Sequence, residues 1–482
     1  MFRPTIACVW LVVAAAGAGC STTPPESTSS SSVLYEGARL IPGDGGPAIE
    51  DSAFLVENDT IARVGRKGEV TSSGATRVDQ TGKTVMPTLI NSHGHPGFQR
   101  GLTYSGENVT RENVMDDLNR AAYFGVAAIQ SQGIEPGDVV YQIRDDQEAG
   151  KLGGALLHVA GTGIGGVHAG PGSATYAGIG AWVEAPTPEE GVRIVQELAG
   201  KRVNSIKIWV DDWAHARARG IARPDQEATR GMKAPVFRAI IQEAHKHGLR
   251  VMAHLYYHAD AEELVAAGAD GLAHLVRDKV MDDALVASIV QHNVYPNANI
   301  AGEQRATNAS LAPWLEESDP MMKLLRESVP PEVIQRMIDS FKNRDPKRLA
   351  DARERYDLLA RNVAKLNAAG ARMMLGADTG TQDNLFGFAE HRELEEMVRA
   401  GLTPAQGIVA ATSRPAEYMG LKDLGTLTPG KLASFIVLDA NPLDDITNTR
   451  RISQVYFKGR LLDRAGMRAR LTAPGPAPRA TK

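Results

Sequence analysis

Hydrophobic and polar residues follow two different patterns along the chain. In residues 33–86, short apolar runs are separated by Gly, Asp and Asn, which predicts small antiparallel strands joined by turns. Residues 87–419 instead alternate short, continuously apolar runs with stretches whose apolar positions have helical spacing. The short-strand pattern returns in residues 420–465. The chain is therefore predicted to have a large central α/β part and a β module made from its two flanks.

Eight buried-strand candidates follow one another in the central part, and helix-like segments separate them. Because eight consecutive strand–helix units can close into a ring, the pattern predicts a TIM (β/α)8 barrel. The predicted fold class is α/β, with a small β-sandwich module formed by both chain ends. The eight candidates are TLINSH, VAAIQSQG, ALLHVAG, SIKIWVDD, RVMAHLYY, GLAHL, VYPNA and MMLGADTG.

The segment 301–370 is too long for a barrel loop and is rich in charged and helix-forming residues. One interpretation is an extra surface helix followed by the ordinary barrel helix. The other is a lid over the barrel mouth, because insertions after the C-terminal ends of barrel strands border the active site. The sequence leaves both interpretations open.

Residues 1–20 have the pattern of an export signal. Arg3 precedes an apolar stretch at 6–16, and small residues lead to Cys20. This ending resembles a bacterial lipobox, in which Cys20 carries a lipid; the alternative is ordinary secretion with cleavage nearby. Residues 21–32 are expected to form a flexible tether and residues 466–482 a disordered tail. The expected location is the periplasm or the outer membrane, with a lipid on Cys20 as the membrane contact.

Composition narrows the choice of partners and sites. The formal net charge is −4 with both signs spread along the chain, so there is no basic stripe for a nucleic acid. Cys8 and Cys20 are the only cysteines, so the folded part has no disulfide, thiolate metal site or cysteine nucleophile. The expected partner is a small-molecule substrate, and the chain is either a monomer or a homo-oligomer.

Two histidines and a lysine stand out in the first and fourth strand candidates. His93 and His95 end the first strand, and alternation places both side chains on one side, although a lone His-x-His also arises by chance. Lys207 lies in an apolar strand that is expected to be buried on both faces. Burial lowers a lysine pKa, and the neutral amine can react with carbon dioxide. The alternative is a lysine that extends from the strand end or pairs with Asp211 or Asp212.

Three more polar residues occupy the same position in later strands. His254 and His274 each end an apolar strand, twenty residues apart, which is about one β/α unit. Asp378 has the same register in the last strand, although Gly376 and Gly380 beside it also suit a turn. Barrel active sites lie at these C-terminal strand ends. The alternative is that each histidine is an ordinary core residue.

The order His-x-His, Lys, His, His, Asp on strands one, four, five, six and eight resembles the amidohydrolase superfamily. Within it, the chain is similar to imidazolonepropionase-like enzymes and to metal-dependent Xaa-Pro or Xaa-Arg dipeptidases, the prolidase-like branch. The similarity runs from about residue 33 to 462. It includes Val85-Met86-Pro87 before the His-x-His, and Gly425-Thr426-Leu427-Thr428-Pro429-Gly430-Lys431 with Asp439 in the closing β segment.

The resemblance implies a centre of two divalent metal ions. Nitrogen and oxygen ligands without sulfur suit zinc, although manganese, cobalt or iron can occupy such a set. The implied roles are that His93 and His95 hold the more buried metal, His254 and His274 the more exposed one, a carbon dioxide-derived carbamate on Lys207 bridges both, and Asp378 contacts the buried metal and the bridging hydroxide.

Two positions depart from the family pattern. Asn91 stands where the family usually has Asp, and Ser434 stands where its Gly-Lys-x-Ala-Asp pattern has Asp. Neither residue is implied to bind a metal, so the departures concern fine positioning.

Two residues are candidates for catalytic contacts with the scissile carbonyl oxygen. His168 resembles the histidine of a Gly-Gly-His segment in the dipeptidase-like branch, although Val167 interrupts that pattern here. Tyr256 resembles the tyrosine of that branch's His-x-Tyr. The alternatives are a loop histidine and a core tyrosine, and Tyr257 and His258 compete for the same role.

The predicted reaction is hydrolysis of a C–N bond, as in dipeptides or N-acyl amino acids. A metal-bridging hydroxide attacks the carbonyl carbon while Asp378 acts as general base and then general acid. Arg277 is a candidate for binding a substrate carboxylate; the alternative is a surface arginine paired with Asp278. Competing activities are hydrolysis of a lactone, carbamate or ester at the same centre. Deaminases usually have one metal and no bridging lysine, so Lys207 argues against them, and a surface lipoprotein without turnover is a further alternative.

Overall fold

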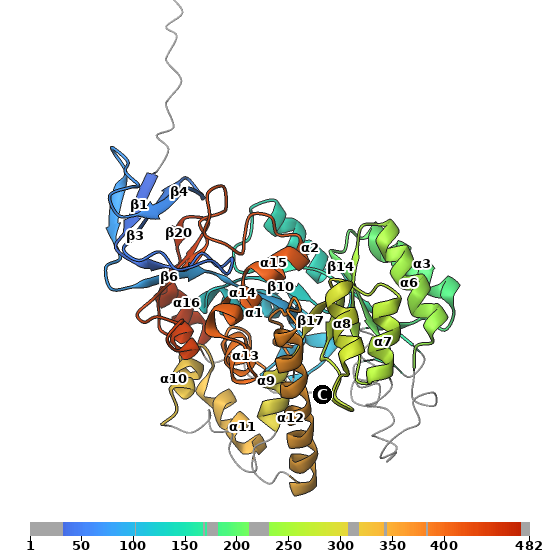
Figure 1. Cartoon of the computed structure of the whole chain (residues 1–482). Helices are drawn as coiled ribbons and strands as arrows, with labels where there is room; N and C mark the ends of the chain where they lie inside the picture. Colours follow the sequence, from blue (N-terminus) through green and yellow to red (C-terminus); the bar gives the residue numbers. More distant parts are fainter. Residues whose placement is uncertain are drawn as a thin grey trace, which may run out of the picture.

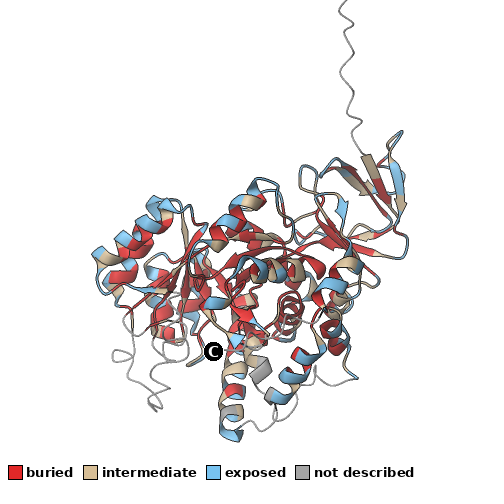
Figure 2. Cartoon of the chain, turned by 180° about the vertical axis from the view of Figure 1, so that it is seen from behind, coloured by how far each residue is buried: buried red, intermediate tan, exposed pale blue. Residues whose placement is uncertain are grey.

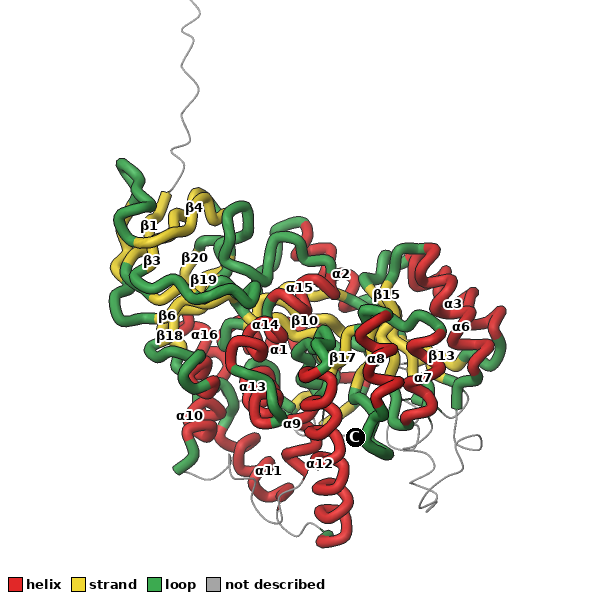
Figure 3. Tube along the Cα trace, viewed as in Figure 1, coloured by secondary structure: helices red, strands yellow, loops and turns green. Residues whose placement is uncertain are grey.

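The computed structural model describes residues 32–101, 103–166, 169–170, 182–211, 231–306, 318–341, 345–381 and 384–473. Figure 1 shows a β-sheet module beside a larger body in which strands and helices alternate. In Figure 3 the strands of the larger body lie inside and its helices surround them.

The larger body is built on parallel strands that pair in chain order. Its third position is split, because β11 pairs with β10 and the following β12 pairs with β14. A hydrogen bond from Asn204 N to Val159 O (2.7 Å) links the split position to the fourth. The strands are β7 (Leu89–Gly94), β10 (Val126–Ser131), β11 (Leu156–His158), β12 (Gly163–Gly165), β14 (Ser205–Trp209), β15 (Arg250–His254), β16 (Gly271–Ala273) and β17 (Tyr295–Asn297).

Residues 373–379 close the ring as its eighth position. They make parallel bridges on both sides, from Met374 to Asn297 of β17 and from Thr379 to Gly94 of β7. A Cβ atom at Gly376 would lie 1.9 Å from the side-chain nitrogen of Asn297, so only glycine allows this close approach. The predicted α/β class with a TIM (β/α)8 barrel is thus confirmed.

A helix follows each barrel position. Several begin where a side chain caps the free backbone N–H groups of the first turn: Thr110 accepts from Asn113 N, and Thr187 accepts from Glu190 N. The helices are α1 (Arg111–Tyr123), α2 (Val139–Glu148), α3 (Pro188–Gly200), α6 (Ala234–Lys246), α7 (His258–Ala266), α8 (Asp283–Gln291), α12 (Pro346–Ala368) and α13 (Phe388–Arg399). Shorter elements are η1 (Gly106–Asn108), β8 (Gln99–Arg100), β9 (Thr103–Tyr104), β13 (Trp182–Glu184), α14 (Pro404–Ala411), α15 (Ser413–Met419), η3 (Ile446–Arg450) and α16 (Arg464–Leu471).

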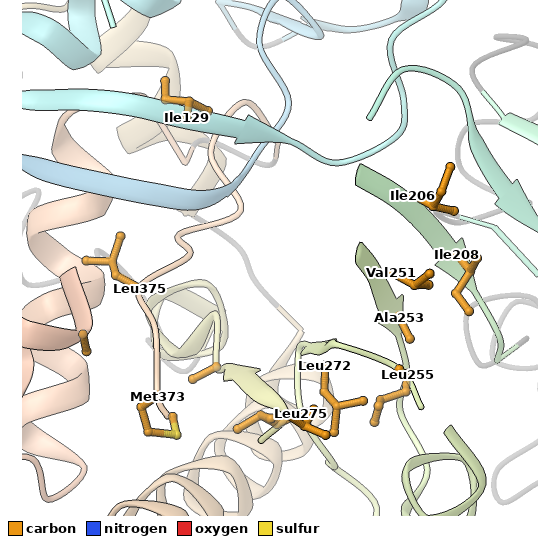
Figure 4. Close-up of a cluster of buried hydrophobic side chains, with 14 of the residues drawn as sticks. Ile129, Ile206, Ile208, Val251, Ala253, Leu255, Leu272, Leu275, Met373 and Leu375 are labelled. Atoms are coloured by element: carbon orange, nitrogen blue, oxygen red, sulfur yellow. The ribbon is translucent and has the colours of Figure 1, made fainter. Parts of the chain in front are cut away.

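Alternate residues of a barrel strand face opposite ways. Ile206 and Ile208 of β14, labelled in Figure 4, belong to the same core cluster as Phe237 and Ile240 of α6, in the layer between strands and helices. Lys207, which stands between them, therefore faces the barrel interior. Figure 2 shows the strands buried and the outer faces of the helices exposed.

The β module consists of two sheets with an aromatic core. Tyr35 stacks on Phe54 at 4.8 Å between ring centroids, and Phe435 stacks on Tyr456 at 4.5 Å, with edge contacts between the two pairs. In the second sheet, β6 pairs antiparallel with β18, which confirms the β-sandwich formed by both chain ends. The sheets contain β1 (Ser32–Glu36), β3 (Ser52–Glu57), β4 (Thr60–Arg66) and β5 (Thr76–Asp79), and β2 (Arg39–Leu40), β6 (Thr84–Pro87), β18 (Phe435–Leu438), β19 (Ile452–Phe457) and β20 (Arg460–Leu461).

The long segment 301–370 is largely helical where it is described. Its helices are α9 (Ile300–Ala306), α10 (Pro320–Arg326), α11 (Pro331–Phe341) and α12. Leu359 and Val363 of α12 belong to the main core, as expected of an ordinary barrel helix. Met322 of α10 and Met337 of α11 pack with Phe388 and α16 instead. Whether the segment acts as a lid stays a prediction.

Several predicted features lie outside the described residues. These are the export signal with Cys20, the tether up to residue 31, His168, Asp212 and the last residues from 474. Among the helices that the structure does describe, none combines the length and apolar character needed to cross a membrane.

Candidate metal centre

Six polar side chains converge at the C-terminal ends of the barrel strands. They come from five different barrel positions, so the closed ring itself brings them together. They are His93 and His95 at the end of β7, Lys207 of β14, His254 of β15, His274 directly after β16, and Asp378 of the eighth position.

Asp378 lies at the middle of the group. Its Oδ1 is 3.1 Å from His95 Nε2 and 3.5 Å from His93 Nε2, and its Oδ2 is 4.0 Å from His274 Nε2. The His274 ring lies 5.0 Å from the His93 ring and 4.6 Å from the His254 ring, measured between centroids. One ligand atom each of His93, His274 and Asp378 lie within 4.8 Å of one another, close enough to share a metal ion.

Burial divides the histidines into an inner and an outer pair. The exposed side-chain fraction is 1% for His93 and 6% for His95, but 13% for His274 and 23% for His254. The inner pair is closed off from solvent, whereas the outer pair is partly open to it. A substrate would therefore approach from the side of His254 and His274.

Two residues of the group have strained backbone conformations. His274 has φ of 68° and Asp378 has φ of 53°, in the left-handed region that residues other than glycine rarely adopt. Such strain costs on the order of 1 kcal/mol or more per residue and is concentrated at functional sites. The His274 backbone is held by hydrogen bonds from its N–H to Asn297 O and to the side-chain oxygen of Asn299, both 3.1 Å.

Burial keeps the histidines of the group neutral. It lowers the pKa of His93, His254 and His274 well below the ordinary value, and nearby cationic groups lower it further. The pKa of His95 is also lowered by burial, although Asp378 opposes the shift. A neutral imidazole offers the lone pair that a metal ion needs.

Lys207 is buried without a hydrogen bond. It is 1% exposed, its Nζ has no partner among the described residues, and it lies 5.5 Å from the Trp209 ring. Burial lowers its pKa to about 7, although Asp378 and Glu135 favour the charged form. The interpretation of a lysine that extends to solvent from the strand end is therefore wrong, because the amine is enclosed.

The donor set fits divalent cations. Buried polar atoms without a hydrogen-bond partner in the described part of the chain include Lys207 Nζ, Nδ1 of His93 and of His95, and Glu135 Oε1. Leaving such an atom unpaired costs on the order of 1–3 kcal/mol. Imidazole nitrogens and carboxylate oxygens without sulfur match the ligand preferences of zinc and similar metals.

Sequence analysis missed Glu135, which joins the group from the loop after β10. Its Oε1 is 3.9 Å from His95 Nδ1, and its other oxygen accepts hydrogen bonds from Ser131 Oγ (3.1 Å) and Gly133 N (3.2 Å). Burial raises the Glu135 pKa to about 8. A carboxylate behind a metal-binding histidine orients its ring. The available signal was an acidic residue just beyond the C-terminal end of the second strand.

Two of the predicted substrate residues lie beside each other. The Arg277 guanidinium is 5.1 Å from the centre of the Tyr256 ring. Arg277 is largely buried and pairs with Glu303 of α9 at 3.2 Å, so the interpretation of a surface arginine paired with Asp278 is wrong. Glu303 also binds Arg355 of α12 at 3.2 Å. Two guanidinium groups therefore share one carboxylate near the outer histidines.

A second histidine–carboxylate group lies on α7 and α8. His258 Nδ1 is 3.4 Å from Glu262 and its Nε2 is 3.4 Å from Asp282. One ligand atom each of His258, Glu262 and Asp282 also lie within 4.8 Å of one another. Both carboxylates are also more than half exposed, whereas the strand-end group is enclosed.

Comparison with known proteins gives a family match over most of the chain. The model of the amidohydrolase family matches residues 84–462. An adenine deaminase of Deinococcus radiodurans is 39% identical over 84 residues, which are 16% of this chain and 16% of the deaminase. The chain thus matches only about a sixth of the length of that curated relative.

Solved structures are similar over nearly the whole chain. A Xaa-Pro dipeptidase with methionine bound in the active site has a TM-score of 0.69 at 20% identity, covering 90% of this chain and 100% of that one. Phenylurea hydrolase B has a TM-score of 0.71 at 23% identity, covering 90% of this chain and 98% of that one. At these identities the similarity establishes the fold.

Proposed function

Because the chain belongs to the amidohydrolase family, we propose that it is a metal-dependent hydrolase that cleaves the C–N bond of dipeptides or N-acyl amino acids. The observation that carries the proposal is the enclosed Lys207 amine, which has no hydrogen-bond partner among the described residues and lies in a ring of neutral histidines around Asp378. A buried amine is stable there only if it changes its charge or gains a partner.

Two divalent metal ions, most simply zinc, fit this set of ligands. His93 and His95 would hold the inner ion, His254 and His274 the outer ion, and Lys207 would bridge them as a carbamate. When bound, the ions polarise the substrate carbonyl and lower the pKa of an attacking water. The Lys207 pKa of about 7 supports the carbamate, because the neutral amine is the form that adds to carbon dioxide.

Asp378 is the proposed proton carrier. It lies between the inner histidines and His274, and it is the acidic group of the set that solvent reaches, with 23% of its side chain exposed. It would accept the proton of the attacking water and then deliver it to the leaving nitrogen. Its carboxylate oxygens lie 3.1 Å, 3.5 Å and 4.0 Å from ring nitrogens of His95, His93 and His274.

The proposed substrate carries a carboxylate next to the scissile amide. Arg277 and Arg355 both pair with Glu303, and the Arg277 guanidinium lies against the Tyr256 ring, so cationic groups that could bind a carboxylate lie at this corner of the site. An N-acyl amino acid or dipeptide would place its carboxylate there, and the Tyr256 hydroxyl would contact the carbonyl oxygen. His168 is proposed for the same oxygen, although it lies outside the described residues.

The second candidate function is hydrolysis of a carbamate, lactone or ester at the same centre. A structural neighbour named for phenylurea hydrolysis supports C–N substrates without an α-carboxylate, and one named Xaa-Pro dipeptidase supports the first choice. The short match to an adenine deaminase favours a nucleobase substrate. A deaminase with one metal needs no bridging ligand, however, so the buried Lys207 argues against that activity.

The test combines metal analysis with a substrate panel. The protein is purified without a tag and with bicarbonate present, and its metals are counted by elemental analysis. Dipeptides, N-acyl amino acids, aryl carbamates, lactones and esters are then offered to the wild type and to Asp378→Asn. Two metals per chain and amide cleavage that Asp378→Asn abolishes would support the proposal. A metal-free chain that leaves the whole panel intact would overturn it.

A matched control comes from the second histidine–carboxylate group. Glu262→Gln also removes a carboxylate beside a histidine, but 53% of the Glu262 side chain is exposed and it lies outside the strand-end group. We expect this variant to keep the metal content and the activity of the wild type. A loss of metal in Glu262→Gln would show that an ion binds at His258, Glu262 and Asp282 instead of at the strand-end group.

A further inference from the structure

The asparagine that departs from the family pattern is fully enclosed and fully hydrogen-bonded. Asn91 and Glu390 both have 0% exposure. The Asn91 amide nitrogen donates to Glu390 Oε1 (2.7 Å) and to Thr379 Oγ1 (2.9 Å), and its oxygen accepts from His93 N (2.9 Å) and Ala377 N (3.2 Å). Both donors and both acceptor positions of the carboxamide are therefore used.

These bonds lie where the first barrel strand changes direction. The register of β7 against β10 shifts between Asn91 and Gly94, so the strand bulges there. Within the bulge, His93 contacts Asp378, whereas Asn91, which precedes it, contacts α13. The Asn91 oxygen accepts from the N–H of His93 and so fixes the backbone within the bulge.

The same carboxamide fixes both neighbours of Asp378. Ala377 precedes Asp378 and donates its N–H to Asn91, and Thr379 follows Asp378 and accepts from Asn91 through its side chain. The strained Asp378 backbone is thus clamped from both sides by one residue of another strand.

Both carboxylate oxygens of Glu390 act as hydrogen-bond acceptors. Its Oε1 accepts from Asn91, and its Oε2 accepts from Gly387 N (2.7 Å) at the start of α13. An aspartate in place of Asn91 would put a second acceptor against Oε1 in a site without solvent. The family's usual aspartate and this chain's Glu390 are therefore incompatible as ionised neighbours.

We propose that Asn91 and Glu390 are a matched positioning pair, in which the strand supplies the amide and the helix supplies the carboxylate, and that this pair holds His93 and Asp378 in place for the reaction. The role of the pair in the reaction rests on the proposed function. The pairing of an amide donor at Asn91 with a carboxylate acceptor at Glu390 depends only on hydrogen-bond direction. It can therefore be tested in metal-free protein.

Exchanging the two groups should preserve every bond. In the double variant with Asn91→Asp and Glu390→Gln, the carboxylate on β7 would accept from the amide on α13 and from the Thr379 hydroxyl. It would still accept from the two backbone N–H groups that Asn91 binds, and the oxygen of the α13 amide would accept from Gly387 N. Asn91→Asp alone places a carboxylate oxygen against Glu390 Oε1, so two acceptors face each other. Glu390→Gln alone places the new amide N–H against a donor, which is either the Asn91 amide nitrogen or Gly387 N.

The experiment is a double-mutant cycle with Asn91→Asp, Glu390→Gln and the double variant. Unfolding by urea is measured at pH 8.5 without metal, so that the facing carboxylates do not simply share a proton. A buried unpaired group costs about 1–3 kcal/mol, so each single variant should raise the unfolding equilibrium constant about tenfold or more. The double variant should return to within about threefold of the wild type.

Metal affinity and kcat provide the readout that a purely structural role would not move. Asn91→Asp is expected to weaken metal binding about tenfold to 100-fold and to lower kcat more than it raises KM, because it displaces His93 and Asp378 rather than substrate contacts. The double variant should recover both. If the metal-free cycle shows coupling but no variant or wild type binds metal, the pair stands and the proposed function fails.

A matched control uses another fully buried asparagine. Asn362 of α12 accepts from Met281 N (2.8 Å) and donates to Val276 O (2.9 Å), far from Glu390 in the hydrogen-bond network. Asn362→Asp combined with Glu390→Gln should be additive. Additivity in the Asn91–Glu390 cycle as well, or a double variant that fails to fold, would overturn the proposal.

Discussion

Two groups of buried polar residues lie side by side in the barrel and differ in how their polar atoms are satisfied. His391 of α13 is 0% exposed, its Nδ1 is 3.0 Å from Thr449 Oγ1 and its Nε2 is 3.1 Å from Phe124 O. His93 at the strand ends is just as buried, yet its Nδ1 has no partner in the described part of the chain.

The difference separates structural from functional burial. On α13, Glu390 and Glu393 likewise direct both carboxylate oxygens at backbone or side-chain N–H groups. At the strand ends, by contrast, Nδ1 of His93 and of His95 and the Lys207 amine have no hydrogen-bond partner among the described residues. A buried polar group with all its hydrogen bonds stabilises the fold. A buried polar group without partners is expected to bind a ligand such as a metal ion.

The largest expected effect comes from removing the open amine. Lys207→Met keeps the volume but deletes the bridging group, so activity should fall on the order of 10³-fold and metal content below two per chain. Metal-free protein should be as stable as the wild type or about 1–3 kcal/mol more stable, since a buried amine is replaced by an apolar chain. Urea unfolding and elemental analysis measure both.

Lys365→Met is the matched control for that variant. Lys365 of α12 donates to Met281 O at 2.7 Å and pairs with Asp283, so it belongs to the bonded class. It should keep its metals and its activity. If Lys207→Met also kept its metals and its activity, the strand-end residues would not differ in function from the hydrogen-bonded buried residues.

The second effect is an acid-dependent loss of stability at the bonded group. Burial lowers the folded-state pKa of His391 to about 4, from an unfolded value near 6.5. Below pH 6.5 the unfolded chain binds the proton more readily, so the contribution of neutral His391 is complete at pH 7 and is lost as pH falls toward 4. The total change is about 3 kcal/mol.

This contribution can be isolated from the other histidines. The stability difference between metal-free wild type and His391→Gln, which does not titrate, should shrink by that amount from pH 7 to pH 4. The strand-end histidines cancel because both proteins contain them. A difference that does not change with pH would show that the pKa of His391 is the same in the folded and the unfolded protein.

A third effect of about 2 kcal/mol is expected at Glu393. Its two oxygens accept from Ile300 N (3.0 Å) and Ala301 N (2.8 Å), so it caps α9. Glu393→Gln turns one acceptor into a donor that faces an N–H. Thermal unfolding should reveal the loss, while the metal content should stay at the wild-type value. Loss of metal without loss of stability would instead place Glu393 in the open group.

The smallest effect is expected at Glu135, which has one hydrogen-bonded carboxylate oxygen and one without a partner among the described residues. One oxygen is bonded to Ser131 and Gly133, and the other faces His95 at 3.9 Å. Glu135→Gln should reduce metal affinity about tenfold, because outer partners of a metal-binding histidine contribute that much. Titration with a competing chelator measures it. Unchanged affinity would assign Glu135 to the bonded group alone.

The barrel was predictable because its strands are short, continuously apolar and separated by amphipathic helices. Each of the eight candidates has its place in the ring, including the eighth, which makes only isolated bridges. The six candidate ligands followed from strand register, and the structure brings them together. Their roles as metal ligands stay predictions until metal is measured.

What the sequence could not reveal depends on departures from regular geometry. The bulge between Asn91 and Gly94 breaks the alternation that had been used to place His93, and nothing in the residue pattern marks it. Glu390 and Glu393 look like the solvated face of a helix, yet α13 is enclosed. Glu135 lies in a loop, where period and register carry no information.

The sheet that joins both flanks of the chain has a consequence for the order of folding. Strand β6 is synthesised before the barrel, but its antiparallel partner β18 emerges only after it. Until then β6 has an open edge, and Tyr35 and Phe54 lack the rings of Phe435 and Tyr456 that cover them. Contacts so distant in sequence form slowly, and open edges invite aggregation. We therefore expect a nascent or truncated chain that lacks β18 and β19 to expose apolar surface of the β module. Such a chain should be more prone to aggregation and proteolysis than the full-length protein.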